Sequence, residues 1–126
     1  MRVLILAAGY ATRMYPLTQN RPKALLPVAG KPVLNYLLEA VIAQRVQKVS
    51  VVTNHRFYPQ FLDWRSQLPE PEKVQVFDDG TATNETRLGA IGDVHFFLGR
   101  TGIDDDLLVM AADNIFQFSF ATFFRF

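Results

Sequence analysis

The chain reads Leu6-Ala-Ala-Gly-Tyr-Ala-Thr-Arg-Met-Tyr-Pro-Leu-Thr18, and then Arg21-Pro-Lys23, close to its beginning. A glycine-bearing, basic loop here directly follows Arg2 to Ala8, a nearly continuous apolar run that is typical of a strand buried on both faces. In a twisted α/β sheet, the loop after the first strand lies at the carboxyl edge, where phosphate groups bind. The stretch therefore predicts an α/β fold with an anion-binding loop.

Basic side chains dominate this part of the chain. The first acidic residue is Glu39, and five basic residues precede it: Arg2, Arg13, Arg21, Lys23 and Lys31. Their unopposed positive field favours an anionic ligand, and the guanidinium of Arg13 is suited to grip two phosphate oxygens. The formal net charge of the whole chain is only +1, which gives no argument for a nucleic-acid or membrane partner, and we expect neither.

Composition limits the class of protein further. The 126 residues are 49% hydrophobic, enough for one packed core, and they include no cysteine. A disulfide framework, a thiolate metal cluster and a cysteine nucleophile are therefore excluded, and we expect a cytoplasmic location. The apolar opening is too short to span a bilayer.

Strand and helix patterns alternate along the remainder of the chain. Gly9 to Lys31 lacks helical periodicity and is expected to be a loop. After it, the pattern predicts a helix from Pro32 to Arg45, a strand Val49–Thr53, a helix Pro59–Leu68, a strand Lys73–Phe77, a helix Glu85–Leu98 and a strand Leu107–Ala112. This alternation predicts a Rossmann-like three-layer αβα fold with a mainly parallel sheet and helices on both faces.

Two common phosphate-binding fingerprints are absent from the loop. Ala11 stands at the second glycine position of the dinucleotide pattern G-x-G-x-x-G, and no Gly-Lys-Ser/Thr follows as a P-loop requires. Hydride transfer and ordinary ATPase chemistry are therefore disfavoured. His55 and His95 lack a second histidine or cysteine at ligand spacing, so we interpret them as structural.

Three segments together resemble one enzyme family. They are Leu6 to Thr18, Arg21-Pro-Lys-Ala-Leu-Leu-Pro-Val-Ala-Gly-Lys-Pro32 and Ala112-Asp-Asn114. They are similar, in order, to the sugar-1-phosphate nucleotidyltransferases, which include glucose-1-phosphate thymidylyl- and uridylyltransferases and mannose-1-phosphate guanylyltransferases. The family opens on L-A-A-G-x-G-T-R-L-x-P-L-T, so Ala11 replaces a glycine.

The resemblance implies a reaction and a set of site residues. Family members join a nucleoside triphosphate to a sugar 1-phosphate and release pyrophosphate. By resemblance, Arg13 would hold the departing pyrophosphate, Lys23 would reach the α-phosphate or the incoming sugar phosphate, and Asp113 would bind Mg²⁺. The nucleotide would contact Leu6, Ala8, Gly9, Tyr10, Ala11, Thr12, Arg13, Lys23 and Gly89.

The match is weaker around Gly89. Leu88-Gly-Ala-Ile-Gly92 is similar to the family element L-G-T-A-G-A, whose first glycine lets the nucleobase approach the backbone. Ala90 and Ile91 replace threonine and alanine, so the preferred base stays open.

The end of the chain is rich in phenylalanine and bears on how much of the family's domain is present. Six of the eleven phenylalanines lie between Phe116 and Phe126, and the family continues well beyond the strand that leads to Asp113. We therefore interpret residues 1–126 as the N-terminal nucleotide-binding part of a nucleotidyltransferase domain, truncated after the metal-binding strand. Two possibilities remain for what covers the phenylalanines: the chain forms a homo-oligomer, or a missing C-terminal segment packs on Phe116–Phe126.

Two other functions also remain possible. One is a non-catalytic nucleotide-binding module or subunit completed by a partner chain, and the other is a molybdenum-cofactor cytidylyl- or guanylyltransferase-like protein.

Overall fold

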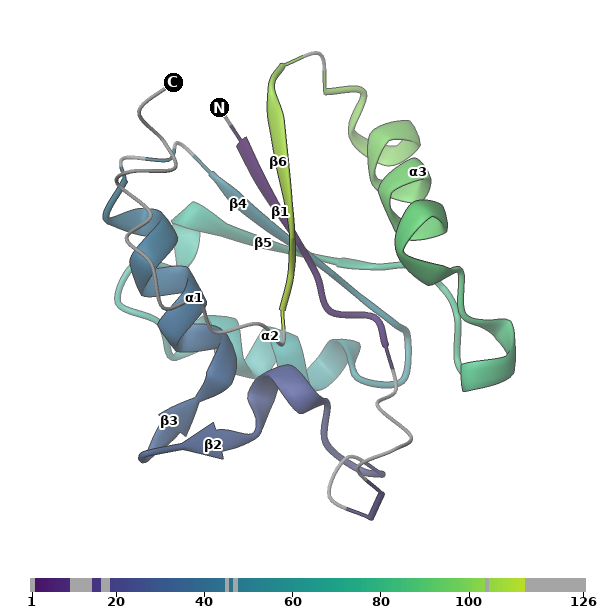
Figure 1. The fold of residues 1–126 in the computed structure, drawn as a ribbon, viewed down its shortest axis with the longest axis horizontal. Helices are drawn as coiled ribbons and strands as arrows, with labels where there is room; N and C mark the ends of the chain where they lie inside the picture. Colours follow the sequence, from purple (N-terminus) through teal and green to yellow (C-terminus); the bar gives the residue numbers. More distant parts are fainter. Residues whose placement is uncertain are drawn as a thin grey trace.

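Four parallel strands form the centre of the molecule. The computed structural model describes residues 2–9, 15–16, 19–44, 46, 48–103 and 105–112. Within these residues, the sheet has the order β5-β4-β1-β6, with β1 at Arg2–Leu6, β4 at Val49–Thr53, β5 at Val74–Asp78 and β6 at Leu107–Ala111 (Figure 1). The predicted parallel sheet is confirmed.

The register places the apolar runs side by side. β1 pairs with β4 from Val3↔Val49 to Leu6↔Val52, and with β6 from Arg2↔Leu107 to Leu6↔Ala111. All five residues of β4 are buried, because strands lie on both sides of it and helices cover both its faces.

Two helices cover one face of the sheet. α1 (Val33–Ile42) and α2 (Tyr58–Ser66) pack on the alternate strand residues Val3, Ile5, Val49 and Val51. The buried side chains of this layer include Leu34, Leu37, Val41, Phe61 and Trp64. α1 begins after Pro32, which suits a first-turn position, but it ends before the predicted Arg45.

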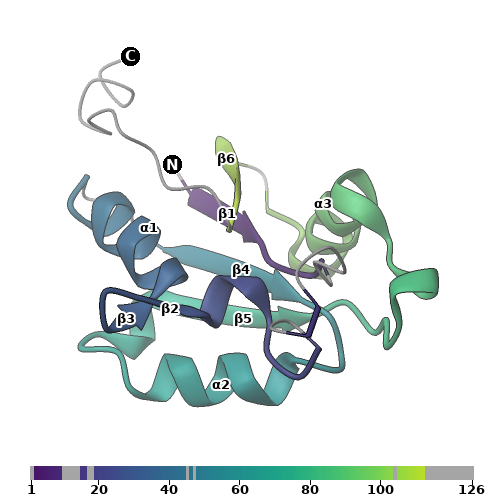
Figure 2. The same cartoon turned by 60° about the horizontal axis from the view of Figure 1, so that its bottom comes forward.

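A single helix covers the other face. α3 (Gly89–Thr101) packs Phe97 on Leu4 and Val52, and the Phe97 ring meets the Phe77 ring edge-on with centroids 5.4 Å apart. Figures 1 and 2 show α3 on the opposite side of the sheet from α1 and α2, which confirms the three-layer arrangement. The predicted start at Glu85 was too early: a 3₁₀ turn η4 (Asn84–Thr86) comes first, and Gly89 has φ 76°.

The described part of the predicted loop 9–31 contains local structure. A 3₁₀ turn η2 (Lys23–Leu25) leads into a small antiparallel hairpin of β2 (Pro27–Val28) and β3 (Lys31–Pro32). Ala29 and Gly30 form the turn with φ 52° and 88°. A further 3₁₀ turn, η3 (Pro71–Lys73), precedes β5. None of the described helices is long and apolar enough to cross a membrane.

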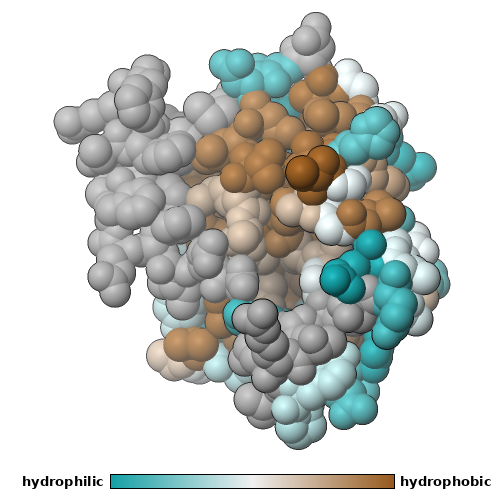
Figure 3. Space-filling view, turned by 45° about the vertical axis from the view of Figure 1, so that its right-hand side comes forward, coloured by the Kyte–Doolittle hydropathy of each residue, from teal (hydrophilic) through white to brown (hydrophobic). Residues whose placement is uncertain are grey.

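Within the part of the chain that the structure describes, several large apolar side chains on the α3 side of the sheet are exposed. Val109 of β6 is 40% exposed, and α3 exposes Leu98 at 41% and Ile91 at 88%. Leu6 and Val94 line the same shallow hollow. Figure 3, which brings this side of the molecule forward, shows a broad hydrophobic area. We call Leu6, Ile91, Val94, Leu98 and Val109 together the α3–β6 face.

Candidate functional site

The connections that follow three strands meet at the carboxyl edge of the sheet. β1 is followed by Ala7-Ala8-Gly9, β4 by Asn54 and His55, and β5 by Asp79-Gly80-Thr81. Because the strands are parallel, these three connections leave the sheet at the same edge. This is the edge at which open α/β sheets bind ligands.

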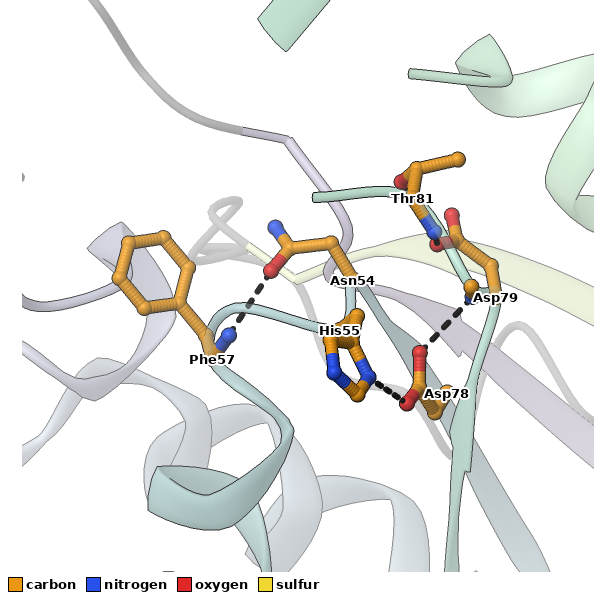
Figure 4. A network of polar contacts seen from close by, with 7 residues as sticks. Asn54, His55, Phe57, Asp78, Asp79 and Thr81 are labelled. Carbon is orange, nitrogen blue, oxygen red and sulfur yellow. Dashed lines mark hydrogen bonds and ion pairs between the residues drawn. The ribbon is translucent and has the colours of Figure 1, made fainter. Parts of the chain in front are cut away.

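Asn54 holds the connection after β1 in place. Its side chain is fully buried, its Nδ2 donates to the carbonyl of Ala8 at 3.0 Å, and its Oδ1 accepts the N–H of Phe57 at 2.9 Å. The second bond links Asn54 to the turn that leads into α2 (Figure 4). Ala8 is therefore anchored, while a Cβ placed on Gly9 would meet no atom within 4 Å. The backbone at Gly9 is open to a ligand.

A second set of contacts links β4 to the residues after β5. The N–H of His55 donates to the carbonyl of Thr81 at 2.8 Å, and its Nδ1 contacts Oδ2 of Asp78 at 2.6 Å. Oδ1 of the same carboxylate accepts the N–H of Gly80 at 2.8 Å (Figure 4). His55 thus has the structural role that the sequence predicted for it.

Asp79 and Asp93 form a buried carboxyl pair. Oδ1 of Asp79 accepts the N–H and the hydroxyl of Thr81 at 2.9 and 2.7 Å. Asp93 lies in α3 with a side chain that is 5% exposed. Its burial, a hydrogen bond to Asp79 and the charge of Asp79 raise the pKa of Asp93 from 3.8 to about 8. The raised pKa favours the protonated form of Asp93 near neutral pH.

The structure describes about half of the predicted site residues. Leu6 ends β1, Ala8 and Gly9 follow at the carboxyl edge, Lys23 lies in η2, and Gly89 begins α3. The other predicted residues lie outside the described part of the chain: Tyr10, Ala11, Thr12, Arg13, Asp113 and the segment Phe116–Phe126. The predicted roles of all these residues stay predictions.

Two carboxylates at the carboxyl edge of the sheet already make other contacts. Asp78 pairs with His55, and Asp79 accepts two hydrogen bonds from Thr81. No group of three or more metal-ligating side chains occurs within the described residues. Asp113, the predicted magnesium ligand, lies outside the described residues, and its role stays a prediction.

Sequence reasoning missed the Asp79–Asp93 pair and the partners of Asn54. The sequence did contain two signals, because polar residues stand at the ends of two apolar strands, in Thr53-Asn-His55 and in Asp78-Asp-Gly80. Ala8 and Asn54 are brought together by the pairing of β1 with β4, and Asp79 and Asp93 by the packing of α3 on the sheet.

Comparison with known proteins gives the family. The sequence matches the model described as "Nucleotidyl transferase" over residues 2–126. The chain belongs to the nucleotidyl transferase family. The resemblance to sugar-1-phosphate nucleotidyltransferases is thereby confirmed at the level of the family.

Individual members of the nucleotidyl transferase family are similar in sequence or in fold. A putative mannose-1-phosphate guanyltransferase of Sulfolobus acidocaldarius is 32% identical over 93% of this chain and 31% of its own length. An apo UDP-glucose pyrophosphorylase structure has a TM-score of 0.72 at 20% identity and covers 89% of this chain and 46% of its own.

A solved CTP:phosphocholine cytidylyltransferase of Streptococcus pneumoniae has a TM-score of 0.71 at 22% identity, over 94% of this chain and 47% of its own. The chain thus spans about a third of that curated relative and just under half of these solved structures. The solved structures share its Rossmann-like α/β fold.

Proposed function

We propose that this chain is the nucleotide-binding part of an enzyme that transfers a nucleotidyl group from a nucleoside triphosphate to a sugar 1-phosphate, releasing pyrophosphate. The junction after β1 supports the proposal most directly. Asn54 anchors the carbonyl of Ala8, and the next residue, Gly9, has no neighbour where a side chain would begin. A phosphate can approach backbone N–H groups at such a site.

The proposed chemistry needs cations more than it needs acids and bases. In-line attack on the α-phosphorus brings two anions together and requires neutralisation of the charge on the phosphate oxygens. Arg13 and Lys23 would supply two positive charges from the loop that follows β1. Mg²⁺, held by Asp113, would supply further positive charge when bound.

We place the binding site for the acceptor, the sugar 1-phosphate, in another part of the enzyme. The guanyltransferase relative and the pyrophosphorylase structure are about three times and about twice as long as this chain, and we propose that their additional residues correspond to the part that supplies most of the sugar pocket. Binding of the triphosphate is then the activity to expect from residues 1–126, and turnover would need the remainder of the domain.

Calorimetric titration tests the proposal. The chain is titrated with dTTP, UTP, GTP, CTP and ATP, with and without Mg²⁺, next to Arg13→Ala and a control, Arg100→Ala, which removes an exposed arginine near the end of α3. We expect magnesium-dependent saturation with one or more triphosphates, lost in Arg13→Ala and retained in Arg100→Ala. A folded chain that binds none of the five would reject the proposal.

A non-catalytic nucleotide-binding subunit is the second candidate. Its support is the exposed α3–β6 face, which a partner chain could cover. Addition of sugar 1-phosphates distinguishes the candidates once the remainder of the domain is present. The enzyme then releases pyrophosphate, whereas a non-catalytic subunit binds nucleotide and releases none even with its partner bound.

A further inference from the structure

Two carboxyl groups meet between α3 and the segment after β5. Asp79 and Asp93 are 9% and 5% exposed. Oδ1 of Asp79 is occupied by Thr81, whereas Oδ2 of Asp79 and Oδ1 of Asp93 are buried without a hydrogen-bond partner when both carboxyls are ionised. Two carboxylates side by side in the interior are costly, and the cost disappears when one proton lies between them.

Asp93 lies on the buried face of α3. Phe97 lies one turn after Asp93 on the same helix face and is fully buried against Val52 of β4 and near Phe77 of β5. The charged or titratable residues in and just before α3 are exposed: Glu85, Arg87, His95 and Arg100. Among the described residues, Asp79 is thus the titratable group that Asp93 faces across the contact between α3 and the sheet.

We propose that Asp79 and Asp93 share one proton, and that this hydrogen bond positions the first turn of α3, including Gly89, for a nucleoside triphosphate. The inference rests on the proposed function, because Gly89 contacts nucleotide only under that proposal. Gly89 and Asp93 are four residues apart and lie on one face of α3. On the other side, the N–H of Asp79 donates to the carbonyl of Thr53 at 2.9 Å. The shared proton therefore joins the start of α3 to β4.

Loss of the proton would replace this attraction by repulsion. The pKa of Asp93, raised to about 8 by burial and by Asp79, places the loss at mildly alkaline pH. If only the protonated pair holds Gly89 in position, the apparent dissociation constant rises as the protonated fraction falls. We expect about tenfold weaker nucleotide binding at pH 9 than at pH 7.

Three variants separate positioning from simple stability. Asp93→Asn keeps a donor for Asp79 but cannot ionise, Asp93→Ala removes the donor, and Asp63→Asn is the matched control on an exposed aspartate of α2. Hydrogen exchange of the amides of residues 89–95 is measured in the nucleotide-free protein from pH 6.5 to 9.5 and corrected for the intrinsic pH dependence of exchange. Triphosphate affinity is measured over the same range.

The proposal expects protection of residues 89–95 to fall between pH 6.5 and about pH 8 and then to level off in the wild type and in Asp63→Asn, and to stay constant in Asp93→Asn. Nucleotide affinity should fall between pH 7 and pH 9 in the wild type and in Asp63→Asn, and should stay constant in Asp93→Asn. Equal pH profiles for the wild type and Asp93→Asn would overturn it. If Asp93→Asn does not fold, Asp79→Asn takes its place, and a pH profile equal to that of the wild type in that variant would overturn the proposal. Absence of triphosphate binding at every pH would reject the proposed function, while the exchange data would still decide whether the shared proton orders α3.

Discussion

The side-chain amide of Asn54 connects the end of β1 to the beginning of α2. It donates to the Ala8 carbonyl and accepts the Phe57 N–H, and the residues Ala8 and Asn54 are 46 positions apart in the chain. All of the Asn54 side chain is buried, so water cannot replace either bond. The side chain of Asn54 thus helps to fix the position of Ala8 just after β1.

Asn54→Ala is expected to lower the free energy of unfolding by about 1–3 kcal/mol, because two buried backbone groups lose their partners. Asn54→Asp is the informative comparison: it keeps an acceptor for Phe57 but sets a carboxylate against the Ala8 carbonyl. We expect it to destabilise the protein at least as much and to weaken triphosphate binding. Urea unfolding and calorimetry measure the two effects. Wild-type stability in Asn54→Ala would contradict this role.

Stability should depend on pH through Asp93. Its pKa is near 3.8 in the unfolded chain and about 8 in the folded protein, so between these values only the folded state binds the proton. Stability therefore falls as pH rises from about 4 to about 8, by up to about 1.4 kcal/mol per pH unit, and then levels off. Urea unfolding at intervals from pH 5 to pH 9 measures this slope.

Asp93→Asn removes the titrating group and should flatten the pH profile of stability, so that the variant gains most over the wild type near pH 8. Asp63→Asn serves again as the exposed control and should follow the wild type. A slope that persists in Asp93→Asn would assign the pH dependence to other groups.

Two glycines of α3 give opposite predictions. A Cβ on Gly92 would come within 2.8 Å of the Leu88 Cβ, whereas a Cβ on Gly99 meets nothing within 4 Å. Gly99→Ala should therefore stabilise the protein by about 0.5–1 kcal/mol, because alanine favours the helix. Gly92→Ala should lose that gain and cost about 1 kcal/mol or more, since Leu88 must move. Thermal unfolding of the two variants provides the comparison. Equal changes in stability would show that Leu88 can move away from the new methyl group without a measurable cost.

The single tryptophan reports on the contact between α1 and α2. Trp64 is 7% exposed, and its Nε1 donates to Oδ1 of Asn35 at 2.6 Å. Asn35→Leu would leave this N–H buried without an acceptor, at a cost of about 1–3 kcal/mol. Asn35→Asp keeps an oxygen in place and should cost less. Denaturant unfolding followed by tryptophan fluorescence tests both variants, and equal losses would exclude the hydrogen bond as the cause.

Much of the sheet was predictable because each strand is a short apolar run bounded by polar or turn residues. Val49–Thr53 was predicted with its observed bounds, and β5 differs from its prediction by one residue at each end. α3 was placed too early because Glu85 to Leu88 fits a helical pattern, while the positive φ of Gly89 separates that segment from the helix. The hairpin of β2 and β3 has two residues in each strand, too few to show a period.

The candidate site was predictable only where it is local. The loop after β1 follows from a continuous motif, and the structure places its described residues at the expected edge of the sheet. Asn54–Ala8 depends on which strands are neighbours, and hydrophobic periodicity in one strand carries no information about that choice. Asp79–Asp93 depends on how α3 packs on the sheet. The carboxyl pair also requires burial from several segments at once.

The open α3–β6 face has a consequence for the handling of the purified protein. β6 is an edge strand of the described sheet and lies beside apolar side chains that remain in water, an arrangement from which strand-to-strand aggregation starts. At high protein concentration, the molecules are expected to aggregate through this face even when the nucleotide loop is intact. A lysine in place of Ile91, the most exposed of the large hydrophobic residues described, should raise the solubility limit without disturbing the core.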